Sequence, residues 1–106
     1  MSTERRRAPR IELVDPLKGQ STSTQTDVVV SDISLTGLRI ESAAPFTVND
    51  VHDFQLTLGD GALVALRGRV VYSRPLTTET ESRYVTGVEF LADATDAAED
   101  VIDRLT

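Results

Sequence analysis

Apolar and polar residues alternate one by one along most of the chain, which is the spacing of strands that bury one face and expose the other. In residues 37–42, for example, Leu38 and Ile40 lie on one face while Arg39 and Glu41 lie on the other. Alternating or continuously apolar stretches bounded by Gly, Pro or polar residues predict the other strands, at residues 10–17, 27–34, 53–58, 62–74 and 83–91. The pattern therefore predicts six short strands at hairpin spacing.

Two features modify individual strands. Residues 19–26 carry no large apolar side chain, so we expect them to form a polar loop after the first strand. Gly68 interrupts the longest strand, which indicates a bulge or a barrel bend at that position.

The apolar spacing becomes helical near the C-terminus. Over residues 93–105 the apolar side chains recur every three or four positions, and acidic residues gather in the first turns, where the helix dipole favours negative charge. Asp93 or Thr95 can cap the first turn. An antiparallel sheet of this size has to close or be covered to protect its edges. We therefore expect an all-β fold, a six-stranded antiparallel β-barrel with a C-terminal α-helix packed across one opening.

The composition is that of one small domain. With 106 residues the chain can close one modest core, and without cysteine it has neither disulfides nor thiolate metal sites. No apolar run approaches the roughly 20 residues of a membrane helix. The first residues also lack the apolar region of a secretory signal. We therefore expect a cytoplasmic protein with no membrane insertion.

Positive charge is concentrated at the N-terminus of an otherwise acidic chain. The formal net charge is −6, yet residues 1–10 hold four arginines and one glutamate. The other 96 residues carry seven basic and sixteen acidic side chains, a net charge of −9. Affinity for nucleic-acid polymers grows with the number of phosphates that the protein neutralises. The net charge of −9 on residues 11–106 therefore argues against a nucleic-acid polymer as partner. It favours a compact anion bound at the basic end, and the alternative is a solvated arginine tail.

The residues that catalysis requires are scarce. The single histidine, His52, lies beside Asp50 and Asp53 at a strand start, where we expect an exposed structural residue. With no second histidine and no cysteine the usual zinc sites cannot form. Neither a GxxxxGK[ST] loop nor a GxGxxG turn is present. We therefore expect neither an enzyme nor a resident metal or cofactor.

Two short motifs flank the predicted strands. Arg6 and Arg10 form an R-x-x-x-R spacing just before the first strand, and Asp32, Ser34 and Gly37 form a D-x-S-x-x-G spacing at a turn between strands. In this order the two motifs resemble those of the PilZ family. The resemblance covers nearly the whole chain and extends to GRVVYSR at 68–74, GVEF at 87–90 and the terminal helix.

The resemblance implies a six-stranded barrel that binds cyclic di-GMP, a bacterial second messenger with two phosphodiesters and two guanines. Arg6 and Arg10 fall on the motif arginines of the family, and a guanidinium can grip phosphate oxygens or the O6/N7 edge of guanine with two hydrogen bonds. Asp32 can accept from guanine N1–H and N2–H₂, and Ser34 on the same face can reach the base or a phosphate. Gly37 permits the turn and a close approach of the ligand. Without the arginines, the second motif would be an ordinary Asx-type turn.

Four further residues are secondary candidates for ligand contacts. Tyr72 and Arg74 end a strand where family members often carry tryptophan, and Tyr72 can stack on a guanine. Alternatively, Tyr72 is a structural aromatic residue in the core or at the rim of the barrel. Arg5 and Arg7 add donors beside the first motif and can hold a second ligand molecule, or they can be solvated.

Three functions are open from the sequence. The first is a regulatory module in which a flexible arm, residues 1–10, closes over a ligand held by the barrel, residues 11–106, and changes a surface that a downstream effector protein recognises. The second is a PilZ-like interaction adaptor that does not use the nucleotide, although the intact motifs argue against it. The third is an oligonucleotide-binding barrel, for which the basic groove and the aromatic platform are lacking.

Overall fold

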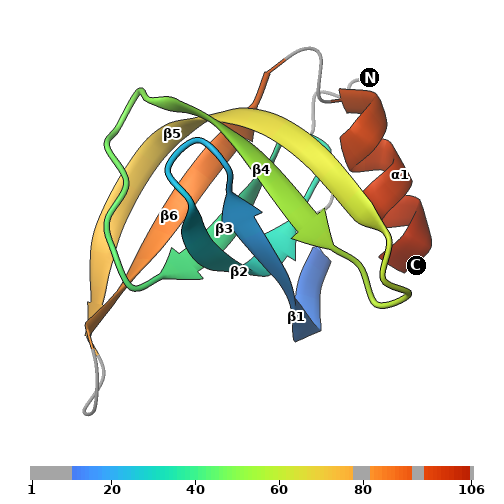
Figure 1. Cartoon of the computed structure of the whole chain (residues 1–106), viewed down its shortest axis with the longest axis horizontal. Helices are drawn as coiled ribbons and strands as arrows, with labels where there is room; N and C mark the ends of the chain where they lie inside the picture. The colour runs from blue at the N-terminus through green and yellow to red at the C-terminus, as the bar shows by residue number, and fades with distance from the viewer. Residues whose placement is uncertain (1–10, 78–81, 92–94, 106) are drawn as a thin grey trace, which may run out of the picture.

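The computed structural model describes residues 11–77, 82–91 and 95–105, which form six strands and one helix (Figure 1). In chain order the elements are β1 (Ile11–Ser21), β2 (Thr26–Ile33), β3 (Gly37–Ser42), β4 (Val51–Thr57), β5 (Leu63–Thr77), β6 (Ser82–Phe90) and α1 (Thr95–Leu105). The predicted arm, residues 1–10, lies outside the described residues, as do the first two positions of the helix predicted at 93–105.

All strand pairs are antiparallel, and the sheet closes into a barrel in the order β1–β2–β3–β6–β5–β4. The pairing of β1 with β4 closes the barrel and removes the free edges that an open sheet would expose. Two of the pairings, β3 with β6 and β1 with β4, join strands that are distant in the chain. The predicted six-stranded antiparallel barrel with a C-terminal helix is confirmed.

Alternate side chains of the strands fill the barrel interior. In β4, His52, Phe54 and Leu56 are buried between exposed neighbours. Burying one large apolar side chain stabilises the fold by roughly 1.5–3 kcal/mol. The most deeply buried apolar residues of the strands are Val28, Val30, Ile33, Leu38, Ile40, Phe54, Leu56, Leu66 and Val70.

The helix packs its apolar face against the barrel. Ala98 and Val101 of α1 are fully buried and belong to the same core as the strand residues. Near the C-terminal end of α1, Arg104 pairs with Asp60 of the β4–β5 turn at 3.6 Å. In the described part of the chain, no helix has the length and apolar character needed to cross a membrane.

The polar loop predicted at 19–26 is wrong for its first three residues and for Thr26, which begins β2. β1 continues through Ser21 and pairs there with both β2 and β4, so the turn is limited to residues 22–25. Ser21 is fully buried, and its Oγ lies 2.9 Å from Nδ1 of His52, which gives both polar side chains a partner inside the barrel. The other ring nitrogen of His52, Nε2, is buried without a hydrogen-bond partner among the described residues. The expectation of an exposed His52 is also wrong, because the alternation of β4 turns its ring into the interior beside Phe46 and Phe54.

Besides a shift of register in β1 between Glu12 and Leu17, β2 and β5 each contain a one-residue β-bulge. In β2, Val30 pairs with Ile40 and Asp32 with Arg39, so Ser31 is the extra residue. In β5, Val70 pairs with Val88 and Tyr72 with Gly87, so Val71 is the extra residue. The register therefore shifts at Val71 and not at Gly68, where a bulge or bend was predicted. Each bulge reverses the facing of the residue that follows it.

Candidate functional site

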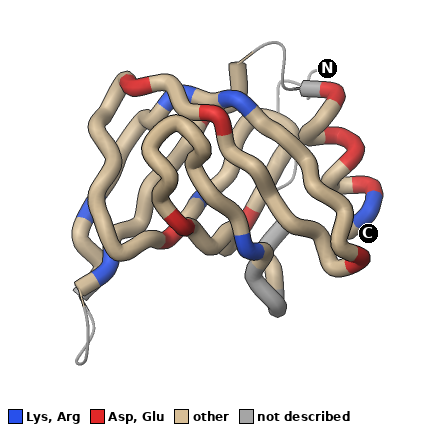
Figure 2. Tube along the Cα trace, viewed as in Figure 1, with Lys and Arg blue, Asp and Glu red and all other residues tan. Residues whose placement is uncertain are grey.

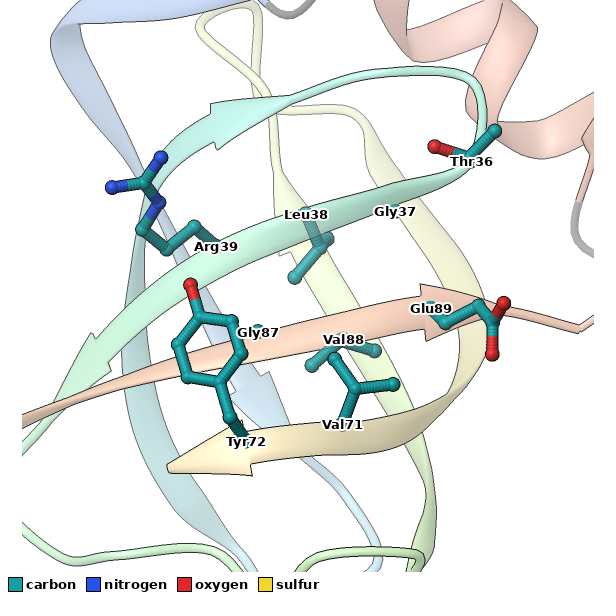
Figure 3. A pocket seen from close by; sticks show the side chains of 9 residues that line it. All are labelled: Thr36, Gly37, Leu38, Arg39, Val71, Tyr72, Gly87, Val88 and Glu89. Atoms are coloured by element: carbon teal, nitrogen blue, oxygen red, sulfur yellow. The ribbon is translucent and has the colours of Figure 1, made fainter. Parts of the chain in front are cut away.

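A shallow pocket of about 330 Å³ lies on the outer surface of the barrel, where β3, β6 and β5 run side by side (Figure 3). Its lining comprises Thr36, Gly37, Leu38, Arg39, Val71, Tyr72, Gly87, Val88 and Glu89. Gly37 belongs to the D-x-S-x-x-G motif, and Tyr72 is a secondary candidate from the sequence. The pocket therefore brings together residues from two separate parts of the predicted site.

The outer surface at this place is organised by one row of paired residues. Asp32 of β2 pairs with Arg39 of β3, Arg39 pairs with Gly87 of β6, and Gly87 pairs with Tyr72 of β5. We call these four residues the Asp32–Tyr72 row. The bulges at Ser31 and Val71 immediately precede its two ends. Strict alternation from the buried Val30 and Val70 would turn Asp32 and Tyr72 into the core, and the bulges instead turn both to the outer face.

Asp32 and Arg39 form an ion pair within this row. Nε of Arg39 lies 3.0 Å from Oδ2 of Asp32, while the side chain of Asp32 is 5% exposed and that of Arg39 is 44% exposed. A carboxylate so deeply buried requires a charged or hydrogen-bonded partner. Arg39 on the adjacent strand β3 is such a partner. Ser31 also joins the bulge to β3, because its Oγ donates to the Arg39 carbonyl at 3.3 Å.

Tyr72 lies flat against β6. Figure 3 shows its ring over Gly87 with the hydroxyl directed toward the Arg39 side chain. A Cβ on Gly87 would overlap the ring, so the ring occupies the space of the missing side chain. The guanidinium carbon of Arg74 lies over the same ring, 4.6 Å from its centroid, which is a cation–π geometry. The sequence candidates Tyr72 and Arg74 are therefore neighbours on the outer face, and Tyr72 is not a core residue.

Ser34 is buried and its hydroxyl takes part in the turn between β2 and β3. Its Oγ lies 3.0 Å from Oγ1 of Thr36 and accepts from the Thr36 amide at 3.2 Å. The Ser34 amide donates to the carbonyl of Gly37 at 2.8 Å. Ser34 does not line the pocket itself, and it meets the pocket through Thr36.

Gly37 has a packing role that the sequence did not show. A Cβ at this position would overlap the carbonyl oxygen of Val88, because β3 and β6 approach each other closely there. Strand β6 therefore requires a glycine at position 37, whether or not a ligand also approaches the backbone there.

The arginines Arg5, Arg6, Arg7 and Arg10 lie outside the described residues. The structure does describe where the chain joins the barrel after them. Ile11, the first residue of β1, pairs with Ile33, and Glu12 pairs with Asp32. The segment that carries the first motif therefore continues into a strand whose first residues lie beside the second motif.

Sequence reasoning assigned only Gly37 and Tyr72 of the pocket lining to the site, and the polar residues Arg39 and Glu89 and the glycine at position 87 were among those it missed. Arg39 was assigned only to a polar face, and its place two residues after Gly37 was the available signal. Gly87 and Glu89 belong to the GVEF segment at 87–90, but no pattern indicated a place in the site, since both reach the pocket through the pairing of β6 with β3 and β5. Glu89 is neutralised by Arg69, whose Nη2 lies 2.6 Å from its Oε1. Residues 11–77, 82–91 and 95–105 contain no group of three His, Asp or Glu side chains able to hold a metal ion.

The fold and the site define a closed antiparallel barrel with a polar pocket and a buried carboxylate on its outer surface. Residues 4–106 match the PilZ domain family. The chain belongs to the PilZ family. None of the curated proteins compared with it matches its sequence.

Solved structures with the same fold support this assignment. The PilZ domain of YcgR from Escherichia coli, solved with c-di-GMP, superimposes with a TM-score of 0.69 at 15% identity, over 92% of this chain and 86% of that one. The complex of K. pneumoniae MrkH with c-di-GMP gives a TM-score of 0.71 at 20% identity, over 97% of this chain and 53% of MrkH. The PlzA protein of Borreliella burgdorferi in complex with c-di-GMP gives 0.63 at 13% identity, over 91% of this chain and 49% of PlzA. The chain thus spans about half the length of MrkH and PlzA. At these identities the likeness shows the fold.

Proposed function

We propose that this PilZ domain is a regulatory module that binds cyclic di-GMP. The observation that carries the proposal is that β1, the strand that follows the first motif in the chain, begins beside the second motif. Glu12, two residues after Arg10 in the chain, pairs with Asp32, and Asp32 pairs with Arg39 at the wall of the pocket. The c-di-GMP complexes of YcgR, MrkH and PlzA support the choice of ligand.

The site residues fit the chemistry of a cyclic dinucleotide. Arg6 and Arg10 supply guanidinium groups for the phosphodiesters or for the O6/N7 edge of guanine. Asp32 accepts from the guanine N1–H and N2–H₂ donors, and the Ser34 hydroxyl exchanges its bond to Thr36 for one to the base or a phosphate. The ring of Tyr72 lies on Gly87 and is covered by the Arg74 guanidinium, so a guanine stacks on Tyr72 by taking the place of Arg74.

The regulatory step in this proposal is closure of the arm. Residues 1–10 fold over a ligand bound on the barrel of residues 11–106, and the changed surface is recognised by a downstream effector protein. The ligand shifts this equilibrium by the difference between its affinities for the closed and the open state. Ordering the arm costs conformational entropy, which the arginine contacts have to exceed. Arg5 and Arg7 contribute further donors in the closed state.

Two other functions were considered for the same barrel. A nucleotide-independent adaptor would have no use for the buried carboxylate of Asp32 beside Arg39, a residue that lines the pocket. An oligonucleotide-binding barrel is opposed by the charge of α1. Figure 2 shows acidic positions along this helix, and the side chains of Asp96, Glu99, Asp100 and Asp103 are exposed there.

Titration calorimetry with cyclic di-GMP, GTP and a short single-stranded oligonucleotide separates these functions. We expect saturable heat with cyclic di-GMP alone, and its loss in the Arg6→Ala/Arg10→Ala double variant. Heat with none of the three ligands would leave the adaptor, and heat with the oligonucleotide would indicate the third function. Closure of the arm is tested by trypsin, which cleaves after arginine: cyclic di-GMP should slow cleavage within residues 5–10 in proportion to site occupancy. Unchanged cleavage at saturation would contradict closure.

A further inference from the structure

Arg39 lines the pocket, and its ion pair with Asp32 places a buried acceptor directly beside this donor on the neighbouring strand. Nε of Arg39 lies 3.0 Å from Oδ2 of Asp32, and Asp32 is its ion-pair partner among the described residues. A guanidinium has five N–H donors in a plane, so one such contact leaves its terminal nitrogens for another acceptor. Asp32 is almost completely covered while Arg39 is 44% exposed. A base that approaches Asp32 from the pocket therefore meets Arg39 first.

This arrangement of donor and acceptor is complementary to one edge of guanine. Along its Watson–Crick edge guanine presents O6, an acceptor, next to N1–H and N2–H₂, both donors. A carboxylate beside a guanidinium presents the opposite order. Adenine has a donor at N6 and an acceptor at N1, so it would face like groups and leave buried polar atoms unpaired.

We propose that Arg39 is a ligand-binding residue that reads guanine together with Asp32. Asp32 accepts from N1–H and N2–H₂, and the terminal nitrogens of Arg39 donate to O6 of the same base. This inference rests on the proposed binding of cyclic di-GMP and adds a specificity-determining residue that lies outside both sequence motifs.

The test compares cyclic di-GMP with cyclic di-IMP, whose hypoxanthine bases keep O6 and N1–H but lack the N2 amine. The affinity ratio of the two ligands therefore measures the contact of Asp32 with N2–H₂, whereas the contact of Arg39 with O6 is common to both. Arg39→Lys keeps a positive charge beside the buried Asp32 and loses the planar fork. Arg39→Met also removes the charge and the donors. Arg67→Gln is the matched control, because Arg67 is an exposed arginine that pairs with Asp53 and does not line the pocket.

We expect Arg39→Lys to weaken both ligands by about 10-fold and Arg39→Met by up to about 100-fold, the range for losing one guanidinium–base contact. The ratio of the two affinities should stay as in the wild type, since independent contacts add. Arg67→Gln should bind both ligands normally. Thermal unfolding of each variant identifies loss of the fold, and if Arg39→Met does not fold, Arg39→Lys decides.

Two results would overturn the inference. Wild-type affinity in Arg39→Lys would show that its fork makes no contact with the base. Weaker binding together with a collapse of the affinity ratio would show that Arg39 only positions Asp32. If the wild-type chain itself binds neither ligand, the proposed function fails, and the reading of guanine by Arg39 fails with it.

Discussion

The aromatic ring of Tyr72 lies directly over Gly87, its partner in the neighbouring strand β6. A Cβ on Gly87 would lie 2.7 Å from Cζ and 2.8 Å from Cδ2 of that ring. Any other residue at position 87 would therefore displace the Tyr72 ring. Arg74 covers the same ring with its guanidinium. The missing side chain of Gly87 thus decides the position of the aromatic ring that lines the pocket.

The first prediction concerns Gly87→Ala. The new methyl group displaces the Tyr72 ring, so we expect the free energy of unfolding to fall by about 1–3 kcal/mol and cyclic di-GMP to bind more weakly. Denaturant unfolding measures the first effect and calorimetry the second. In a Tyr72→Ala background the same substitution should cost little, because nothing remains for the methyl group to displace. An equal cost in both backgrounds would show that the ring is not what excludes a side chain.

The second prediction concerns the arm. Arg6→Lys and Arg10→Lys keep the charge and lose the planar fork, so each should weaken cyclic di-GMP by about 1–3 kcal/mol, up to about a hundredfold. The melting temperature should barely change, because the barrel core of the described residues is complete without these side chains. Unchanged affinity in both lysine variants would leave only a solvated arginine tail.

The third prediction concerns base selectivity. Cyclic di-GMP and cyclic di-AMP share one macrocycle and one charge, so phosphate attraction cancels when they are compared. We expect the wild-type chain to prefer cyclic di-GMP, and Asp32→Ala to weaken its binding and narrow the preference. Arg6→Ala should weaken binding while leaving more of the preference intact. Equal binding of both dinucleotides by the wild type in a side-by-side titration would contradict the role of Asp32.

The fourth prediction separates packing from ligand approach at Gly37. Because a Cβ there overlaps the backbone of β6, Gly37→Ala should lower the free energy of unfolding by about 1–3 kcal/mol or more. Gly59→Ala is the control, since a Cβ at Gly59 meets nothing within 4 Å, and it should stay within about 0.5 kcal/mol of the wild type. If Gly37→Ala were as stable as the wild type but bound no cyclic di-GMP, the glycine would serve the ligand and not the contact of β3 with β6.

Local patterns in the sequence were sufficient for the elements and for the two motifs. Leu38 and Ile40 are buried while Arg39 is exposed, as alternation predicted, because facing within a regular strand follows from the geometry of neighbouring residues. The helical spacing of Ala98 and Val101 likewise predicted the side of α1 that packs on the barrel. The residues of the D-x-S-x-x-G motif could be named because they are close together in the chain.

Only the tertiary structure decided how these residues are arranged as a site. The extra residues Ser31 and Val71 shift the register of β2 and β5, and so turn Asp32 and Tyr72 to the outer face of the sheet, where alternation alone would turn them into the core. Arg39 of β3 pairs with Gly87 of β6, and these two strands are separated in the chain by β4 and β5. A bulge and a long-range strand pairing depend on how whole strands fit against each other, and no short stretch of sequence contains that information.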